Sequence, residues 1–113
     1  MKRFAMSLDL VDKPDSIEKY KKYHQNVWPE VKNGLLAIGI LDMDIYLLGN
    51  RLFMVIHTAD DFDINKDFQK YTESSKKAAD WDNLMRDFQQ KTPFTKKGDW
   101  WAPMEKVFEL HVA

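Results

Sequence analysis

The sequence predicts an α+β domain in which one four-stranded antiparallel sheet carries its helices on one face. Three observations support this fold class: a segment of alternating apolar residues near the N-terminus, a two-residue hairpin signal at residues 49–50, and two stretches in which apolar residues recur every three to four positions. The elements follow in the order strand, helix, strand, strand, helix, strand. With 113 residues, the chain is expected to form a single domain, residues 1–113, around one core.

The first strand is expected at residues 2–10. Its even-numbered positions from Phe4 to Leu10 are large and apolar, whereas Ser7 and Asp9 lie among the odd-numbered ones. This period of two is typical of a strand. The turn-like sequence that follows it includes Asp15 and Ser16, and one of these is expected to cap the next helix.

The first helical region is expected to extend to about residue 38. Its apolar stripe consists of Ile17, Tyr20, His24, Val27, Val31 and Leu35. Pro29 interrupts this region, because proline lacks the backbone N–H and crowds the carbonyl four residues back. We therefore expect a break near residues 25–28, a second helical piece capped by Asn26, and an end at Gly39.

Residues 40–48 and 51–58 are expected to form a hairpin, because Gly49 and Asn50 between them are a two-residue turn signal. Both strands carry bulky apolar residues on both faces. A sheet with one face in water would have polar residues on that face, so this sheet is expected to be covered twice.

The second helical region is expected to begin at residues 60–63 and to break within residues 72–75. It resumes with apolar residues at spacings of three and four, namely Ala78, Trp81, Met85 and Phe88. Residues 91–99 are expected to be a loop. Residues 104–110, with Val107 and Phe108, are expected to form the last strand.

This order of elements is the ferredoxin-like βαββαβ pattern. Both helical regions then cover the same face of the sheet, and the chain provides no third layer for the other face. Tyr46, Phe53 and Val55 are expected on that other face, where an exposed apolar patch is typical of an interface. We therefore expect a homodimer with the two sheets face to face, a dimeric α/β barrel.

Composition excludes several classes of function. Seventeen basic and eighteen acidic residues give a net charge of −1, so no overall field draws the chain to nucleic acid or to an anionic membrane. The absence of cysteine excludes disulfides, thiolate metal sites and a cysteine nucleophile. The N-terminal apolar run is too short for a signal sequence or a membrane span. We therefore expect a cytoplasmic protein.

His24 is the first candidate for chemistry. Tyr20 precedes it by four residues and Trp28 follows it by four, so all three share one face of an unbroken helix. One interpretation is a core histidine held by a hydrogen bond. The other is an imidazole that gives and takes a proton near pH 7, among aromatic walls that suit a sugar ring. The residues alone leave both interpretations open.

The other titratable residues give weaker evidence of a functional site. His57 and His111 show no metal-ligand spacing with the third histidine, so no metal site is expected. Asp42 and Asp44 project to one face of their strand. They are interpreted as a solvated or interfacial pair with a partner such as Arg51, and only weakly as the paired carboxylates of a glycosidase.

The tryptophans differ in what they indicate. Trp81 belongs to the apolar stripe of the second helical region, so core packing is its default role. Trp100 and Trp101 stand in the loop before the last strand. Loops rarely hold two tryptophans without a surface to close.

The segments YKKYHQNVWPE, GILDMDIY, GNRLFMVI and MEKVFEL resemble the L-rhamnose mutarotase family, over about residues 2–110. The most specific motif is present here as Tyr20, His24 and the Trp-Pro-Glu of residues 28–30. The resemblance implies a ferredoxin-like dimer and a cofactor-free enzyme that interconverts the α and β anomers of a 6-deoxy sugar, with L-rhamnose expected first and L-fucose as the alternative. It also implies that His24 is the proton donor and that Tyr20 contacts the sugar.

Further sugar contacts are expected at four positions. Trp28 and Trp81 can provide an aromatic wall for the C6 methyl group. A sugar-contacting tyrosine of the family falls on Met43, and the second of two tandem tryptophans falls on Asp82. These two changes bear on the choice of sugar more than on the reaction, because a site that lacks a hydrogen-bond partner discriminates less.

Two other functions remain open at this point. Dimeric ferredoxin-like domains also include cofactor-free oxygenases, which would consume oxygen while acting on an aromatic substrate. A non-catalytic ligand-binding or assembly module would use His24 only as a structural residue.

Overall fold

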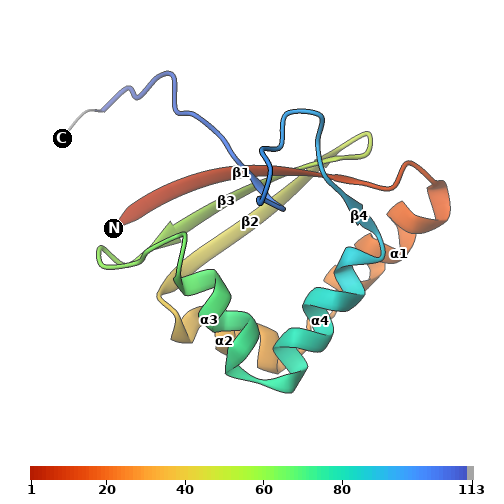
Figure 1. Cartoon of the computed structure of the whole chain (residues 1–113), viewed down its shortest axis with the longest axis horizontal. Helices are drawn as coiled ribbons and strands as arrows, with labels where there is room; N and C mark the ends of the chain where they lie inside the picture. Colours follow the sequence, from red (N-terminus) through yellow and green to blue (C-terminus); the bar gives the residue numbers. More distant parts are fainter. Residues whose placement is uncertain (112–113) are drawn as a thin grey trace.

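The structure, a computed structural model, describes residues 1–111. Its elements are β1 (Lys2–Leu10), α1 (Pro14–His24), α2 (Pro29–Ala37), β2 (Ile40–Leu48), β3 (Arg51–Thr58), α3 (Asp67–Ser74), α4 (Lys76–Arg86), β4 (Gln89–Gln90) and β5 (Ala102–Pro103). The strands form one antiparallel sheet in the order β2-β3-β1-β4, with β5 also paired to β1. The four helices all lie on one side of this sheet (Figure 1). The predicted ferredoxin-like α+β fold is thus confirmed.

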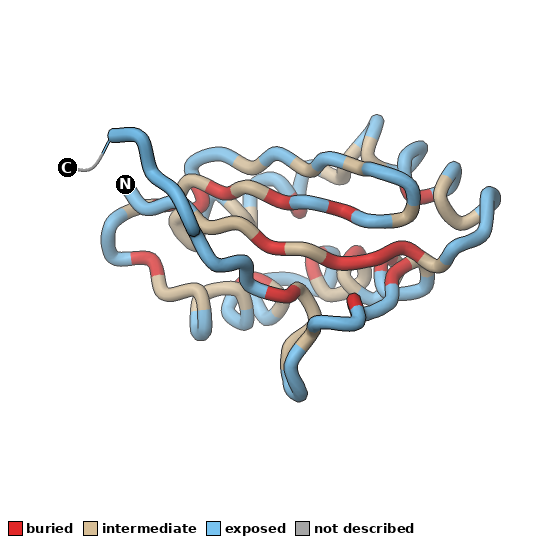
Figure 2. Tube along the Cα trace, turned by 90° about the horizontal axis from the view of Figure 1, so that it is seen from above, coloured by how far each residue is buried: buried red, intermediate tan, exposed pale blue. Residues whose placement is uncertain are grey.

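The first strand and the hairpin have the predicted bounds. β1 pairs with β3 from Lys2 opposite Thr58 to Asp9 opposite Arg51. Gly49 lies in the turn between β2 and β3 with a φ of 61°, a conformation that favours glycine. Buried and more exposed positions alternate along β3 (Figure 2). Within one chain, therefore, only one face of the sheet is covered.

The first helical region divides where Pro29 predicted a break. α1 ends at His24, and α2 begins with Pro29 as its first helical residue. The N–H that proline lacks would have no partner within the helix at this position, so its absence costs no hydrogen bond. The expected N-caps were Asp15 or Ser16 for the first piece and Asn26 for the second. These predictions were wrong, because Lys13 and Trp28 precede the two helices and neither side chain caps the backbone.

The second helical region begins later than predicted. Residues 60–66 form turns around the buried Phe62, and α3 starts only at Asp67, whose carboxylate accepts the backbone N–H of Asp63 at 2.7 Å. The predicted break at residues 72–75 is confirmed. The Ser75 hydroxyl oxygen accepts the Ala78 N–H at 3.1 Å and so begins α4 as a separate helix.

The last strand was predicted in the wrong place. The edge of β1 that does not face β3 pairs with two short strands, β4 (Gln89–Gln90) and β5 (Ala102–Pro103). The Met104 N–H makes a further hydrogen bond to the Ala5 carbonyl at 2.9 Å. Residues 104–110 then leave the sheet on the side away from the helices (Figures 1 and 2). Val107 and Phe108 are 87% and 75% exposed, so apolar character alone did not make this segment a strand.

The core lies between the sheet and the helices. One cluster joins Leu10 and Leu52 of the sheet to Trp81 and Met85 of α4, and a second surrounds Ile56. On the opposite face of the sheet, side chains are more exposed. Among the described residues, none of the helices has the length and apolar character needed to cross a bilayer.

Candidate active site

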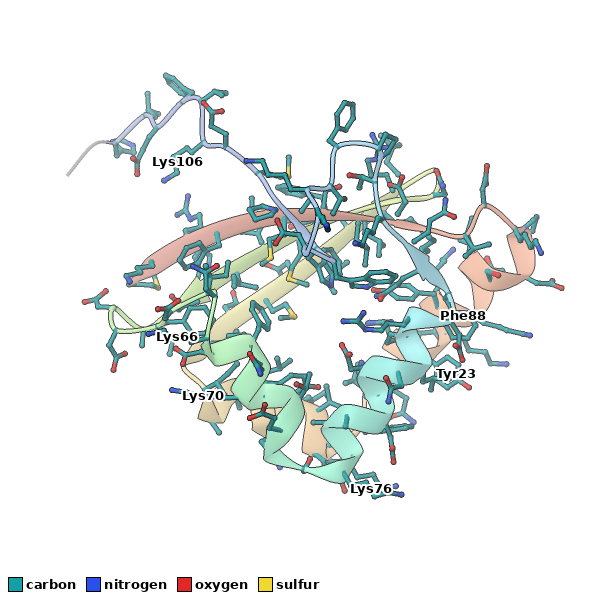
Figure 3. All side chains as sticks on the ribbon, viewed as in Figure 1. Tyr23, Lys66, Lys70, Lys76, Phe88 and Lys106 are labelled. Carbon is teal, nitrogen blue, oxygen red and sulfur yellow. The ribbon has the colours of Figure 1, made fainter. Side chains whose placement is uncertain are left out.

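A cavity of about 1100 Å³ opens between the covered face of the sheet and the helices. Its size slightly exceeds the roughly 300–1,000 Å³ that is typical of sites for small molecules. Side chains from the strands and from the helices point toward one another across this region (Figure 3). The residues that contribute polar or aromatic groups to its wall include Tyr20, His24, Trp81, Asp82, Gln89 and Trp100.

His24 is the last residue of α1 and is half-buried at the cavity wall. Its Nδ1 lies 2.9 Å from the backbone carbonyl oxygen of Tyr20. A carbonyl oxygen only accepts, so Nδ1 carries the proton and Nε2 of the neutral ring keeps its lone pair. Burial lowers the pKa of His24 below its ordinary value, and the hydrogen bond to Tyr20 opposes this shift only in part. At neutral pH, His24 is therefore an uncharged base.

Tyr20 lies one helical turn before His24, and the centres of the two rings are 4.2 Å apart. Its side chain is buried, and this burial raises the pKa of the phenol to about 12, although a hydrogen bond from the Gln89 side chain lowers it in part. Tyr20 therefore keeps its proton at neutral pH. A proton acceptor and a proton donor lie side by side on one wall of the cavity.

Trp81 of α4 closes this wall. Its ring meets the His24 ring edge-on at 5.5 Å and the Trp28 ring edge-on at 5.1 Å. Trp28 is not among the described residues that line the cavity, and the Lys77 ammonium lies 5.4 Å from its ring centre. Trp28 thus supports Trp81 from behind rather than facing the cavity.

The two positions where the chain departs from the family pattern both line the cavity. Met43 is half-buried on β2, and Asp82 lies on α4. The Asp82 carboxylate accepts a hydrogen bond from Arg86 Nε at 3.0 Å. Its pairing with Arg86 leaves Asp82 one carboxylate oxygen for a ligand.

Several polar cavity residues did not emerge as candidates from the sequence, among them Arg86, Gln89 and Asp99. They fall at helix ends, on a two-residue strand and in a loop, where no periodic pattern marks them. The tandem tryptophans did give a signal, because a loop with two indoles needs a surface to close. Trp100 and Trp101 supply that surface by lining the cavity.

The remaining titratable candidates lie elsewhere. His57 stands on the open face of the sheet, where its ring nitrogens are 3.1 Å from Arg3 Nε and 3.8 Å from the Asp42 carboxylate. The suggested partner Arg51 instead binds Asp9, with Nε and Oδ1 2.8 Å apart. Within residues 1–111, no three His, Asp or Glu side chains converge as a metal-binding group.

Comparisons with known proteins identify what this chain is similar to. The family described as L-rhamnose mutarotase matches residues 3–110. A UPF0734 protein of Dictyostelium discoideum is 54% identical over 112 residues, which cover 96% of this chain and 90% of that protein. An L-fucose mutarotase of Xanthomonas campestris pv. campestris is 31% identical over 120 residues, covering 100% of this chain and 91% of the relative.

A solved structure adds support for the fold. The crystal structure of an L-rhamnose mutarotase from Formosa agariphila superimposes with a TM-score of 0.71, covering 98% of this chain and 100% of that one. At 23% sequence identity, this likeness bears on the fold alone.

Proposed function

The chain belongs to the L-rhamnose mutarotase family, and from this premise we propose that it interconverts the α and β anomers of a 6-deoxyhexose by acid–base catalysis. The observation that carries the proposal is the pairing of His24 and Tyr20 in the cavity wall. One offers a lone pair and the other offers a proton at the same pH.

Mutarotation needs one base and one proton donor. The bond between C1 and the ring oxygen breaks, while the anomeric hydroxyl loses a proton and the ring oxygen gains one. Rotation about the C1–C2 bond then turns the other face of the aldehyde to the C5 hydroxyl, and the ring closes again. Positioned acid–base groups contribute on the order of 10²- to 10⁴-fold to such a step.

We assign the two roles from the protonation states. His24 Nε2 takes the proton of the anomeric hydroxyl, and the Tyr20 hydroxyl gives its proton to the ring oxygen as the C1–O5 bond breaks. On closure, the histidinium returns its proton to the aldehyde oxygen, and the C5 hydroxyl returns one to Tyr20. His24 is thus a base in ring opening and the proton donor in ring closure, and neither step requires a cofactor.

L-Rhamnose is the first substrate that we propose, because the family description names this sugar. L-Fucose is the second, because the Xanthomonas relative is an L-fucose mutarotase. Both sugars carry an apolar C6 methyl group, which suits the apolar surfaces of Met43 and Trp81 in the cavity wall. The pairing of Asp82 with Arg86 provides groups that can bind ring hydroxyls.

Exchange NMR tests the reaction and the substrate together. The rate of exchange between the anomeric proton signals is measured for L-rhamnose, L-fucose and their 6-hydroxylated counterparts L-mannose and L-galactose, with and without protein. We expect faster exchange for the two 6-deoxy sugars. Equal or faster rates with the hydroxylated pair would show that the methyl group is not recognised, and no acceleration with any sugar would overturn the proposed function.

We also propose that the active form is a homodimer in which the open faces of the two sheets meet. Tyr46 on this face is 60% exposed and pairs with Phe53, whose ring centre lies 6.2 Å away. The apolar residues of the C-terminal segment, with Val107 and Phe108 among them, extend on the same side of the sheet. A second copy would remove both apolar surfaces from water.

A further inference from the structure

Arg86 is a charged residue that the acid–base assignment above does not use. It is the last residue of α4 and stands four residues after Asp82, so the two side chains share one face of the helix. Both line the cavity, and Arg86 Nε donates to the Asp82 carboxylate at 3.0 Å. The side chains of Arg86 and Asp82 are 46% and 37% exposed, so neither is closed off from a ligand in the cavity.

The indole of Trp100 holds the guanidinium from a second side. The central carbon of the Arg86 guanidinium lies over the Trp100 ring, 4.6 Å from its centre, which is within the range of a cation–π interaction. The indole is itself fixed, because its Nε1 donates to Oε1 of the buried Gln89 at 2.9 Å. Two neighbours therefore orient Arg86 in the cavity wall.

This arrangement leaves both kinds of hydrogen-bonding group for a ligand. A guanidinium carries five N–H donors, and Asp82 uses the one on Nε. Among residues 1–111, the hydrogen bonds of Arg86 use Nε alone of its three nitrogens. Asp82 keeps one carboxylate oxygen as an acceptor. Donors and an acceptor therefore stand next to each other at one place on the wall.

Two neighbouring hydroxyls of a sugar match such a pair of groups. A hydroxyl both donates and accepts, so one can accept from a guanidinium while the next donates to a carboxylate. In the proposed reaction, His24 and Tyr20 engage the anomeric hydroxyl and the ring oxygen. The hydroxyls at C2, C3 and C4 are then left for other residues, and L-rhamnose and L-fucose differ in the orientation of those at C2 and C4.

We propose that Arg86 determines sugar specificity: held over Trp100, it donates from a terminal nitrogen to one hydroxyl among C2, C3 and C4, while Asp82 accepts from the hydroxyl on a neighbouring carbon. This inference rests on the proposed function, which supplies the class of sugar. A sugar whose hydroxyl points the other way leaves a charged group without its partner and binds less tightly. Arg86 contacts neither C1 nor the ring oxygen, so it strengthens binding of the substrate and of the transition state alike.

The decisive variant is Arg86→Met, which keeps the length of the side chain and removes the charge and the N–H donors. The matched control is Lys76→Met on the same helix. Lys76 also pairs with an aspartate four residues away, Asp80, at 3.8 Å, but neither residue belongs to the described wall of the cavity. Circular dichroism checks that both variants are folded.

Binding is measured by NMR titration of the parent sugar and of its 2-, 3- and 4-deoxy derivatives. The parent is whichever of L-rhamnose and L-fucose the wild type binds more tightly. In the wild type and in K76M, we expect removal of the hydroxyl that Arg86 contacts to raise the dissociation constant about tenfold or more. In R86M, removal of the same hydroxyl should change it less than about twofold. Equal ratios of deoxy to parent sugar in the wild type and R86M at all three positions would overturn the role of Arg86, as would equal behaviour of K76M and R86M.

A second variant, Asp82→Asn, decides the case in which R86M does not fold. The amide oxygen still accepts from Arg86, while the amide nitrogen replaces the carboxylate oxygen that is left for a ligand. In D82N, we expect the hydroxyl on the neighbouring carbon to lose its effect on binding. The same ratios in D82N as in the wild type would overturn the paired recognition.

Exchange NMR separates this inference from the proposed function. We expect R86M to raise KM about tenfold or more with a much smaller change in kcat, whereas loss of an acid–base group lowers kcat. A lowered kcat with unchanged KM in R86M would overturn its role in binding. Absence of exchange in the wild type would instead overturn the proposed function, and the titrations, which need no turnover, would still decide the role of Arg86.

Discussion

A single backbone contact sets the state in which His24 meets a substrate. Because Nδ1 donates to the Tyr20 carbonyl, the neutral ring presents Nε2 as a base, and burial keeps the ring neutral. The same helical spacing places the Tyr20 phenol against the imidazole. The surroundings of these two residues thus leave His24 without a proton on Nε2 and Tyr20 with its proton, and the proposed roles of base and proton donor rest on this difference.

Replacement of His24 by Gln should abolish most of the acceleration of anomer exchange. The amide keeps the polarity and approximate size of the side chain but offers no basic nitrogen, so a loss of about 10²-fold or more in kcat is expected. Exchange NMR measures the loss, and circular dichroism checks that the variant is folded. Near wild-type exchange in a folded H24Q protein would refute the assignment of His24 as the base.

The pH dependence of kcat/KM should follow His24 on the acid side alone. Since burial lowers the His24 pKa, activity should be constant at neutral pH and fall only below the ordinary value of 6.5. The Tyr20 pKa of about 12 predicts no fall between pH 7 and about pH 10. If kcat/KM already began to fall above pH 7 as the pH was lowered, the lowered His24 pKa would be contradicted.

The lowered His24 pKa also predicts how folding stability changes with pH. The unfolded chain binds a proton at His24 more readily than the folded protein does. The contribution of this group is therefore complete above pH 6.5 and decreases as the pH falls through that value toward the lower folded-state pKa. Urea denaturation of wild type and H24Q between pH 5 and pH 8 measures the free energy of unfolding of each protein. An equal pH dependence in both proteins would rule out a contribution from the His24 pKa.

Replacement of Tyr20 by Phe tests the donor. The ring and its packing against His24 remain, while the hydroxyl proton is lost. We expect kcat/KM to fall about tenfold or more with little change in the circular dichroism spectrum. If Y20F kept the wild-type kcat/KM, Tyr20 would have no part in the reaction.

At the scale of elements, short helices position the site. α4 carries Trp81, Asp82 and Arg86 within eleven residues, and its first turn depends on the Ser75 hydroxyl. A helix of this length has little stability of its own and depends on its cap and on the packing of its apolar face. The start of α4 therefore matters for a site whose residues lie roughly one to three turns further along it.

Ser75→Ala should destabilise the protein by about 1 kcal/mol, because the Ala78 N–H loses its acceptor. A loss of stability of this size lowers the midpoint of thermal unfolding by several degrees. Ser74→Ala is the matched control, since the Ser74 hydroxyl donates to the Tyr71 carbonyl at the end of α3 and caps no helix N-terminus. Equal midpoints for S75A and S74A in calorimetry would show that the cap contributes nothing specific.

At the scale of the whole molecule, the sheet is covered on one face only. The helices bury the face that carries Leu52, Met54 and Ile56, and the opposite face leaves Tyr46 and Phe53 in contact with water. Strong hydrophobic residues on both faces of one sheet indicate a second layer that a single chain does not supply.

Sedimentation should therefore give a particle of twice the 13.4 kDa chain mass at micromolar concentration. Tyr46→Asp should shift it toward the monomer, because each half of the interface would then bury a carboxylate on an apolar surface. Leu36→Asp is the control, since Leu36 is 61% exposed on α2, away from the open face. A monomer of the wild-type protein would contradict the dimer, and equal effects of both variants would place the interface elsewhere.

The sequence alone determined the features that depend on neighbours along the chain. Period-two alternation located β1, the glycine turn located the hairpin, and Pro29 and residues 72–75 located the two helix breaks. Tyr20 and His24 were found in the same way, because residues four apart on a helix are neighbours in space. These signals are local, so a single sequence is enough to read them.

Only the tertiary structure decided what depends on distant partners. The edge of β1 pairs with residues 89–90 and 102–103 rather than with residues 104–110, because the loop between them brings two short segments to that edge. In the same way, Gln89 accepts a hydrogen bond from the Trp100 indole only when that loop folds over the cavity. A hydrogen bond between segments far apart in the chain leaves no periodic trace in either segment. The sequence therefore indicated Tyr20 and His24 as candidates but gave no sign of the bond between Gln89 and Trp100.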